Sequence, residues 1–394
     1  MLEKYSLRMP GAVFSGKDAL ENIVSILKSN KVQRLAVFTD KGIEKTGLYD
    51  LVMGYVNEYV GPTGTACKTF DDLPPEPTYL QAQKLVDQCK EFKADFIIAV
   101  GGGSVMDTAK LASLLMTDEY GIKELLDNPL LANKCIKTLT IPTTAGTGAE
   151  ATPNAIVAVP EKELKVGIVN PQMISDYVIL DARMIKNLPR KIAAATGVDA
   201  LAHAIECFTS NKANPFSDIF ALQALDMILN NIERACDDPN AMDAKNNMQI
   251  ASFYAGIAIT ASGTTAVHAL SYPLGGKYHI AHGVSNAILL APVMRFNEDA
   301  CTERLAIAYD RCLGGTFGSC AEPKTKEEKS HAVIARLEEI VKHLDIPTSL
   351  TEFGVPKEDL DVLVEAGMQV TRLLNNNLKK VTAADARYIY SQVM

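Results

Sequence analysis

Three of the six histidines in this 394-residue chain, His268, His279 and His282, fall within the single stretch GTTAVHALSYPLGGKYHIAHGVSN. Imidazole is the commonest transition-metal ligand, so this concentration indicates a metal site. Upstream, in VDALAHAIE, Asp199 and His203 are four residues apart, and on a helix this spacing places both side chains on one face. Each residue alone has a commoner role as a helix cap or core side chain. In combination they predict one carboxylate and two or three imidazoles around a cation, Zn²⁺ or Fe²⁺.

A continuous apolar run, ADFIIAV (94–100), leads directly into GGGSVMDTAK (101–110). A buried strand, a glycine turn and a helix in this order point backbone N–H groups and a helix N-terminus at a phosphate. Glycine allows positive φ and close approach of a diphosphate, and Ser104 is the expected helix cap, with Asp107 completing a capping box. Such turns also occur without a ligand, and the pattern is not GxGxxG. The residues expected to face a phosphate are Gly101, Gly102, Gly103 and Ser104.

Other positions could also contact a nucleotide. Asp40 ends the strand-like run RLAVFTD, where a carboxylate can bind a ribose diol and repel a 2′-phosphate, or act as a helix cap. The loop TIPTTAGTG is either a tight connection or a site for phosphate or the nicotinamide ribose, and its central hydroxyls belong to Thr143, Thr144 and Thr147. Lys165, ahead of the β-type run VGIVN, could reach an anionic ligand.

The chain is long enough for two domains, and its pattern changes character near residue 186. Before that point short apolar runs alternate with helical periodicity, including a helix expected over 79–92, which is typical of an α/β domain with a parallel sheet. Beyond it, long helical stretches follow one another. We therefore expect an α/β dinucleotide-binding domain over 1–185 and an all-helical, metal-binding domain over 186–394.

Charge and composition exclude several classes of protein. The formal net charge of −8 argues against nucleic acid or an anionic membrane as the main partner. No apolar run is long enough to span a bilayer. The N-terminus lacks the basic-then-apolar pattern of a signal peptide, so we expect a cytoplasmic protein. The eight cysteines form no CxxC pair and are expected to be free thiols.

A nucleotide-type half and a metal-type half together suggest one reaction. A cation acts as a Lewis acid on an alcohol or carbonyl oxygen, and a nicotinamide takes or gives the hydride. Two alternatives come from other classes. A metal-dependent hydrolase needs no hydride carrier, and a nucleotide-binding protein without catalysis has little use for the Asp199–His203 pair, so we rank both below a dehydrogenase.

The chain resembles the iron-containing (group III) alcohol dehydrogenases, which include lactaldehyde reductase and 1,3-propanediol dehydrogenase. The segments that carry the resemblance are GGGSVMDTAK, IPTTAGTGAE, TGVDALAHAIE and HAL…PLGG…HG, in the family's order and over nearly the whole length. The resemblance implies an N-terminal α/β dinucleotide domain and an all-helical C-terminal domain. It further implies NAD(H)-linked hydride exchange with a small aldehyde or alcohol, and a homodimer or larger homo-oligomer.

The resemblance also implies roles for individual residues. The metal, Fe²⁺ or Zn²⁺, would be held by Asp199, His203, His268 and His282. The cofactor site would consist of residues 101–104 at the diphosphate, with Asp40, Thr143, Thr144, Thr147 and Lys165. Asp40 favours NAD(H) over NADP(H). Substrate-pocket positions in relatives correspond here to Asn154, Ile259 and Leu373.

The chain departs from the family pattern at three places. Tyr272 stands where many members carry a second histidine one turn after His268, so proton transfer runs through the Tyr272 hydroxyl or through cofactor ribose and water. We expect Tyr272 and the ligand His282 to be the catalytic residues. Lys379 replaces the usual arginine and Glu76 a frequent asparagine, and both are expected to tune loops or assembly.

The sequence leaves the substrate open. Arg372 and Lys277 lie near expected pocket and ligand residues in the sequence, so an aldehyde with an anionic group is one possibility beside a small neutral one. Two relatives in the same superfamily suggest other chemistry: a glycerol-dehydrogenase-like polyol dehydrogenase and a dehydroquinate-synthase-like lyase. Net NADH turnover would separate the dehydrogenases from the lyase.

Overall fold

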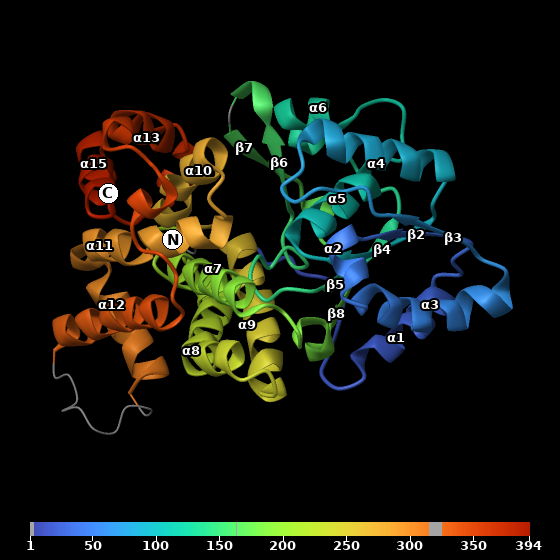
Figure 1. Cartoon of the computed structure of the whole chain (residues 1–394), viewed down its shortest axis with the longest axis horizontal. Helices are drawn as coiled ribbons and strands as arrows, with labels where there is room; N and C mark the ends of the chain where they lie inside the picture. Colours follow the sequence, from blue (N-terminus) through green and yellow to red (C-terminus); the bar gives the residue numbers. More distant parts are fainter. Residues whose placement is uncertain (1–3, 163, 315–324) are drawn as a thin grey trace. The chain divides into compact units, whose positions relative to one another are not determined.

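The computed structural model describes residues 4–162, 164–314 and 325–394 (Figure 1). The chain divides into two compact units. Arg8–Leu188 forms the first, which we call the α/β unit, and Pro189–Met394 together with residues 4–7 forms the second, the helical unit. The division falls between Leu188 and Pro189, close to residue 185, where we expected the first domain to end.

The α/β unit is built on a parallel sheet, as its continuous apolar runs predicted. Every residue of the central strand β4 is buried, because helices shield both faces of a parallel sheet from water. In order across the sheet the strands are β1 (Ala12–Ser15), β8 (Tyr177–Leu180), β5 (Lys137–Pro142), β4 (Phe96–Gly101), β2 (Arg34–Phe38) and β3 (Ala66–Phe70).

Helices cover the two faces of this sheet (Figure 1). On one face α1 (Asn22–Ser29) and α3 (Leu48–Thr63) share a buried core with the sheet. On the other face a second core includes α4 (Tyr79–Phe92), α5 (Gly103–Leu114) and α6 (Ile122–Asp127). Alternate residues of β2 enter the two cores, as the period of a strand requires.

Two helix starts in this unit show how local sequence sets the boundaries. Thr78 and Gln81 form a capping box, and α4 spans the residues 79–92 predicted for it. The predicted cap of α5 is wrong: Gly102 is the N-cap residue, and Ser104 lies inside the first turn. Asp107 accepts a hydrogen bond from the Ile156 backbone N–H at 2.9 Å instead of completing a capping box.

A hairpin stands apart from the main sheet in the α/β unit. Its strands, β6 (Asn154–Val159) and β7 (Leu164–Val169), are antiparallel. The Ala158 backbone N–H donates to the Pro77 carbonyl at 3.0 Å. The proline-rich segment ahead of α4 is therefore fastened to this hairpin.

The helical unit surrounds one long buried helix, α7 (Arg190–Phe208). All of its residues from Gly197 onward are buried, and it packs among α8, α9 and α11. A helix shielded on every side belongs in a core, so its polar side chains must find partners there. The other helices described are α8 (Pro215–Asp237), α9 (Met242–Ala261), α10 (Ala266–Tyr278), α11 (His282–Cys312), α12 (Lys326–His343), α13 (Leu360–Met368), α14 (Thr371–Leu374) and α15 (Ala383–Ser391), and the α/β unit adds α2 (Lys41–Lys45).

Among the described residues, no single helix has the length and apolar character needed to cross a bilayer. Helices α9 and α10 taken together meet those criteria, with a bend of 105° between them. Most residues of both helices are buried within the helical unit.

Candidate metal centre and cofactor-binding loops

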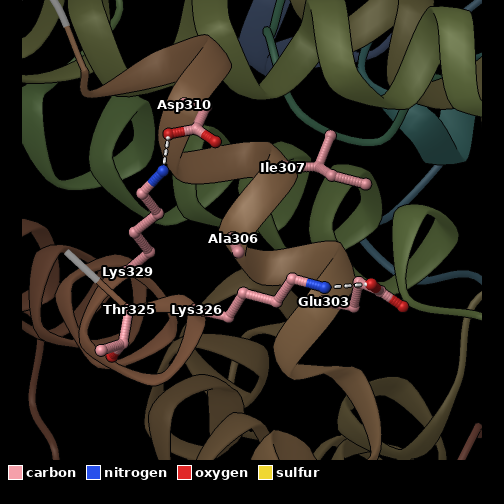
Figure 2. A pocket seen from close by; sticks show the side chains of 7 residues that line it. All are labelled: Glu303, Ala306, Ile307, Asp310, Thr325, Lys326 and Lys329. Carbon is pink, nitrogen blue, oxygen red and sulfur yellow. Dashed lines mark hydrogen bonds and ion pairs between the residues drawn. The ribbon is translucent and has the colours of Figure 1, made fainter. Parts of the chain in front are cut away.

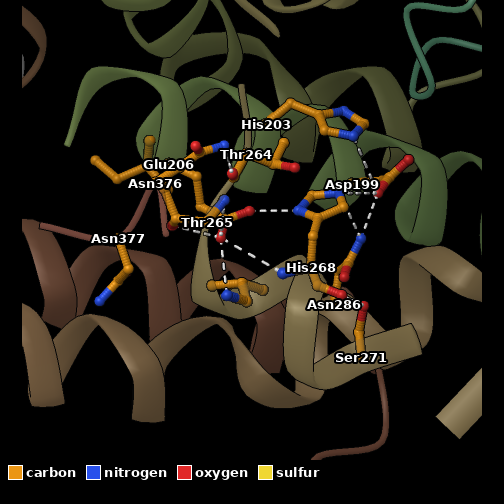
Figure 3. A network of polar contacts seen from close by, with 12 residues as sticks. Asp199, His203, Glu206, Thr264, Thr265, His268, Ser271, Asn286, Asn376 and Asn377 are labelled. Atoms are coloured by element: carbon orange, nitrogen blue, oxygen red, sulfur yellow. Dashed lines mark hydrogen bonds and ion pairs between the residues drawn. The ribbon is translucent and has the colours of Figure 1, made fainter. Parts of the chain in front are cut away.

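The four predicted metal ligands meet in the helical unit (Figure 3). Asp199 and His203 lie one turn apart on α7, His268 lies on α10, and His282 is the first residue of α11. One ligand atom from each falls within 4.8 Å of all the others. The Nε2 atoms of His203, His268 and His282 lie 3.9, 3.7 and 3.6 Å from Asp199 Oδ1.

This geometry fits a transition-metal ion. Metal–ligand bonds of about 2.1 Å at tetrahedral angles separate neighbouring ligand atoms by about 3.4 Å, close to the distances from Asp199 Oδ1. Asp199, His203 and His268 are buried, whereas the side chain of His282 is 33% exposed. The site is therefore closed by core packing on one side and accessible near His282.

Electrostatics hold the carboxylate in its charged form. Burial alone would raise the pKa of Asp199, but the facing imidazoles of His203, His282 and His268 keep that pKa well below its usual range. Burial lowers the pKa of His268, yet Glu206 and Asp199 together raise it to about 9. A cation therefore has to displace a proton from His268 when it binds.

Glu206, which the sequence analysis missed, supports His268 from behind. Its Oε2 accepts a hydrogen bond from His268 Nδ1, and its Oε1 accepts from the backbone N–H groups of Thr265 (3.0 Å) and Val267 (2.8 Å). A proton fixed on Nδ1 leaves the Nε2 lone pair directed at the other ligands. The position of Glu206 in HAIE, one helical turn after His203, could have indicated this role.

Asn286 is a second residue that the sequence analysis missed. It lies one turn after His282, and its Nδ2 donates to Asp199 Oδ1 at 2.7 Å. The same nitrogen lies 3.1 Å from His268 Nε2 and 3.3 Å from His282 Nε2. Asn286 Oδ1 is buried and accepts no hydrogen bond from the described residues. The i, i+4 spacing from His282 in HGVSN could have indicated it.

The C-terminal asparagine run reaches the same network (Figure 3). Asn376 Nδ2 donates to the Thr264 carbonyl at 2.9 Å, next to the Thr265 that binds Glu206. Asn377 exchanges amide hydrogen bonds with Asn297. The asparagine run 375–377 thus supports the turn that begins α10.

Two nearby side chains have distinct places. Tyr272 lies one turn after His268 on α10, with its ring centroid 6.0 Å from that of His282. His279 caps the C-terminal end of α10 in a left-handed conformation with φ of 56°. His279 is not one of the four clustered ligands.

The glycine turn of the α/β unit is closely packed. The three glycines at its centre do not use the positive φ that glycine allows. A Cβ on Gly101 would lie 2.6 Å from Val105, and one on Gly103 would lie 3.1 Å from Thr147. A Cβ on Gly102 would meet only Thr144, at 3.8 Å. Close packing against Val105 and Thr147 therefore leaves little room for a side chain at Gly101 and Gly103, whereas a Cβ at Gly102 would make only an ordinary van der Waals contact.

The threonine loop adjoins this turn. The Thr143 backbone N–H donates to the Gly101 carbonyl at 3.1 Å, and the Thr143 hydroxyl is buried without a partner among the described residues. Thr144 and Thr147 are the nearest neighbours of Gly102 and Gly103, respectively. The structure thus brings the predicted diphosphate turn and the predicted threonines together.

Asp40 is a helix cap in this structure. Its Oδ1 accepts hydrogen bonds from the backbone N–H groups of Gly42 (2.7 Å) and Ile43 (3.0 Å) at the start of α2. A hollow of about 370 Å³ adjoins it beyond the carboxyl ends of β2 and β3, where ligands of open parallel sheets commonly bind. The hollow is lined by Lys41, Asp71, Asp72, Leu73, Pro74, Gln81 and Lys84.

The remaining expected residues belong to several different elements. Asn154 begins β6 in the α/β unit, whereas Ile259 and Leu373 belong to α9 and α14 of the helical unit. Lys165 pairs with Glu76 at 2.6 Å. Lys277, considered as a partner for an anionic substrate, pairs with Asp359 at 2.8 Å.

A second hollow, of about 270 Å³, lies on α11 and α12 (Figure 2). Lys329 pairs with Asp310 and Lys326 with Glu303 along its walls. None of the expected ligand, cofactor or substrate residues lines it.

Comparison with known proteins identifies relatives over the full length. Residues 10–182 match the family model described as iron-containing alcohol dehydrogenase, and residues 193–394 match that of the Fe-containing alcohol dehydrogenase family, C-terminal. Long-chain-alcohol dehydrogenase 1 of Geobacillus thermodenitrificans is 34% identical over 378 residues, which are 95% of this chain and 93% of that protein.

Solved structures agree with this match. A 1,3-propanediol oxidoreductase superposes with a TM-score of 0.92 at 27% identity, covering 100% of both chains. The sulfoacetaldehyde reductase of Bifidobacterium kashiwanohense, solved in complex with NAD⁺, superposes with a TM-score of 0.87 at 25% identity, covering 100% of this chain and 99% of that one.

Proposed function

This chain belongs to the iron-containing alcohol dehydrogenase family, and we propose that it reduces a small aldehyde to its alcohol with NADH, or runs the reverse reaction. The observation that carries the proposal is the convergence of one carboxylate and three imidazoles within 4.8 Å in a largely buried site. Such a donor set suits a divalent transition metal.

We assign the metal to Asp199, His203, His268 and His282. When bound, Fe²⁺ or Zn²⁺ supplies Lewis acidity toward the substrate oxygen. Asp199 contributes negative charge to the site, and Glu206 keeps His268 in the tautomer that offers Nε2. Because His282 is the exposed ligand, substrate would approach beside it.

We assign the cofactor, NAD(H), to the loops of the α/β unit. Gly101, Gly102, Gly103 and Ser104 would hold the diphosphate, because backbone N–H groups at the start of α5 favour an anion. Thr143, Thr144 and Thr147 border the same turn. Asp40 retains a second carboxylate oxygen for a ribose diol and disfavours NADP(H) by charge. Lys165 would contact the cofactor after separating from Glu76.

Tyr272 is our candidate for proton transfer. Its ring lies one turn after His268 and 6.0 Å from the His282 ring, centroid to centroid, which supports a role in proton transfer beside the proposed metal. The proposed pocket residues are Asn154, Ile259 and Leu373. The ion pair of Lys277 with Asp359 argues against Lys277 as the partner of an anionic substrate.

Three further assignments complete the proposal. The α/β unit serves the cofactor and the helical unit serves the metal. The similarity to a 1,3-propanediol oxidoreductase and a sulfoacetaldehyde reductase supports a small alcohol or aldehyde as substrate, and no nucleic-acid or membrane partner is proposed. A cytoplasmic location and a homodimeric or larger assembly follow from the sequence arguments above.

The test is NADH oxidation with a panel of neutral and anionic short aldehydes, using protein purified without oxygen. The same protein is then stripped with a chelator and reloaded with Fe²⁺ or Zn²⁺. Activity should disappear with the metal and return with one of the two ions. Turnover in metal-free protein would reject the metal assignment. Absence of net NADH turnover despite bound metal and cofactor would favour the lyase alternative.

A further inference from the structure

Glu76 sits between the glycine turn and the only lysine assigned above to the cofactor. Its backbone N–H donates to the Ser104 hydroxyl at 3.3 Å, and its carboxylate pairs with Lys165 Nζ at 2.6 Å. Glu76 thus links the first turn of α5 to strand β7. Glu76 holds this position with a φ of 51°, which non-glycine residues adopt rarely.

The surroundings of Glu76 limit how the segment can move. The Ala158 backbone N–H donates to the Pro77 carbonyl, and the Tyr79 hydroxyl donates to Glu161 at 3.0 Å. These contacts hold Pro77 and Tyr79, which follow Glu76 in the chain, against the hairpin segment. The side chains differ in freedom, because that of Lys165 is 11% exposed and that of Glu76 is 42% exposed. The Glu76 carboxylate, as the more exposed partner, can therefore turn into water when the ion pair breaks.

We propose that Glu76 competes with the cofactor diphosphate for Lys165, and so weakens cofactor binding and speeds cofactor release. The inference rests on the proposed function, which places a diphosphate at residues 101–104. A diphosphate there is negatively charged, as Glu76 is. It would bind beside Ser104, the residue that the Glu76 backbone N–H contacts. To turn to the diphosphate, Lys165 must first break its ion pair with Glu76, and the free energy lost with that pair is subtracted from the free energy of cofactor binding.

The direct measurement is the NADH dissociation constant without any aldehyde, followed by nicotinamide fluorescence. The chain contains no tryptophan, which keeps the optical background low. Glu76→Gln removes the charge and keeps the shape. Because partly exposed ion pairs contribute modestly, we expect about threefold to tenfold tighter binding at low salt and a smaller gain at high salt. Stopped-flow measurements should show slower NADH release.

A double-mutant cycle with Lys165→Gln tests the mechanism. Lys165→Gln alone should weaken NADH binding, and Glu76→Gln should add little in that background, because the competition is already gone. Glu76→Asn removes the same charge with a residue that tolerates positive φ. Equal gains for Gln and Asn attribute the effect to charge, whereas a gain for Asn alone would attribute it to backbone strain and overturn the proposal.

Asp118→Asn is the matched control, since Asp118 also pairs with a lysine, Lys90, at 2.6 Å but lies beyond the other end of α5. It should leave NADH binding unchanged, and an equal gain there would overturn the proposal. An unchanged or weaker constant for Glu76→Gln, or an undiminished gain in the Lys165→Gln background, would also overturn it. Failure of the wild-type chain to bind NADH would reject the proposed function itself.

Discussion

Replacing Glu206 by glutamine tests how far a buried carboxylate sets the affinity of the metal centre. Glu206 must present oxygen on two sides, to His268 Nδ1 and to the N–H groups of Thr265 and Val267. A glutamine amide has one oxygen. If that oxygen keeps the N–H groups, the NH₂ group faces Nδ1 and drives the ring proton to Nε2, the atom that lies 3.7 Å from Asp199.

A His268 ring protonated on Nε2 offers no lone pair to a cation. Hydrogen-bond partners of metal-ligating histidines commonly change metal affinity by about 10–100-fold, which corresponds to about 1.4–2.7 kcal/mol. We therefore expect Glu206→Gln to raise the dissociation constant of Co²⁺ or Zn²⁺ by about that factor. Competition with a coloured chelator at fixed pH measures this without any turnover.

The control is Asp181→Asn in the α/β unit. Asp181 is also buried and pairs with Arg183 at 2.6 Å, so its loss disturbs folding without touching the metal ligands. Thermal unfolding of the metal-free proteins separates stability from affinity. A folded Glu206→Gln protein that binds metal with the wild-type constant would refute the assignment of the His268 tautomer to Glu206.

Three other predictions use the remaining features of the two units. Gly101→Ala should destabilise the α/β unit by about 1–3 kcal/mol because its Cβ would meet Val105, whereas Gly102→Ala should unfold normally in urea yet bind NADH less well. Tyr272→Phe should lower kcat by about 100-fold with little change in KM if the phenol transfers the proton, and an unchanged kcat and pH profile would exclude that role. Burial raises the pKa of Glu150 from 4.5 to about 7, so the wild type should lose stability as pH rises from 4.5 to 7. Glu150→Gln should then stabilise the α/β unit by up to about 3 kcal/mol at pH 8 and by little at pH 4.5, and equal effects at both pH values in urea unfolding would contradict this.

Features that depend on local spacing could be predicted from the sequence. Asp199 and His203 were identified because the rise of a helix alone brings positions i and i+4 together. The helix over 79–92 was predicted because prolines end the preceding segment and its apolar positions repeat with helical period. The parallel sheet was predicted because its central strand β4 is buried on both faces and appears in the sequence as an uninterrupted apolar run.

Features that depend on contacts between distant segments could not be predicted. Glu206 contacts His268, 62 positions away, and Asn286 contacts Asp199, 87 positions away. Spacing from His203 and His282 indicates the helix face of each residue but not these distant partners. His279 could not be separated from His268 and His282 until the left-handed end of α10 was known. Ser104 was misassigned as a cap because Gly102 begins the helix without a side chain.

The four proposed metal ligands all belong to the helical unit, and the proposed diphosphate turn and its threonines all belong to the α/β unit. The proposed metal site contains no residue of the α/β unit, and the proposed diphosphate turn contains no residue of the helical unit. Changes in the free energy of metal binding and of dinucleotide binding should consequently be additive when ligand and loop substitutions are combined, provided that each is measured without the other partner. Substitutions at the two sites should thus change the affinity for the metal and the affinity for the dinucleotide independently of each other.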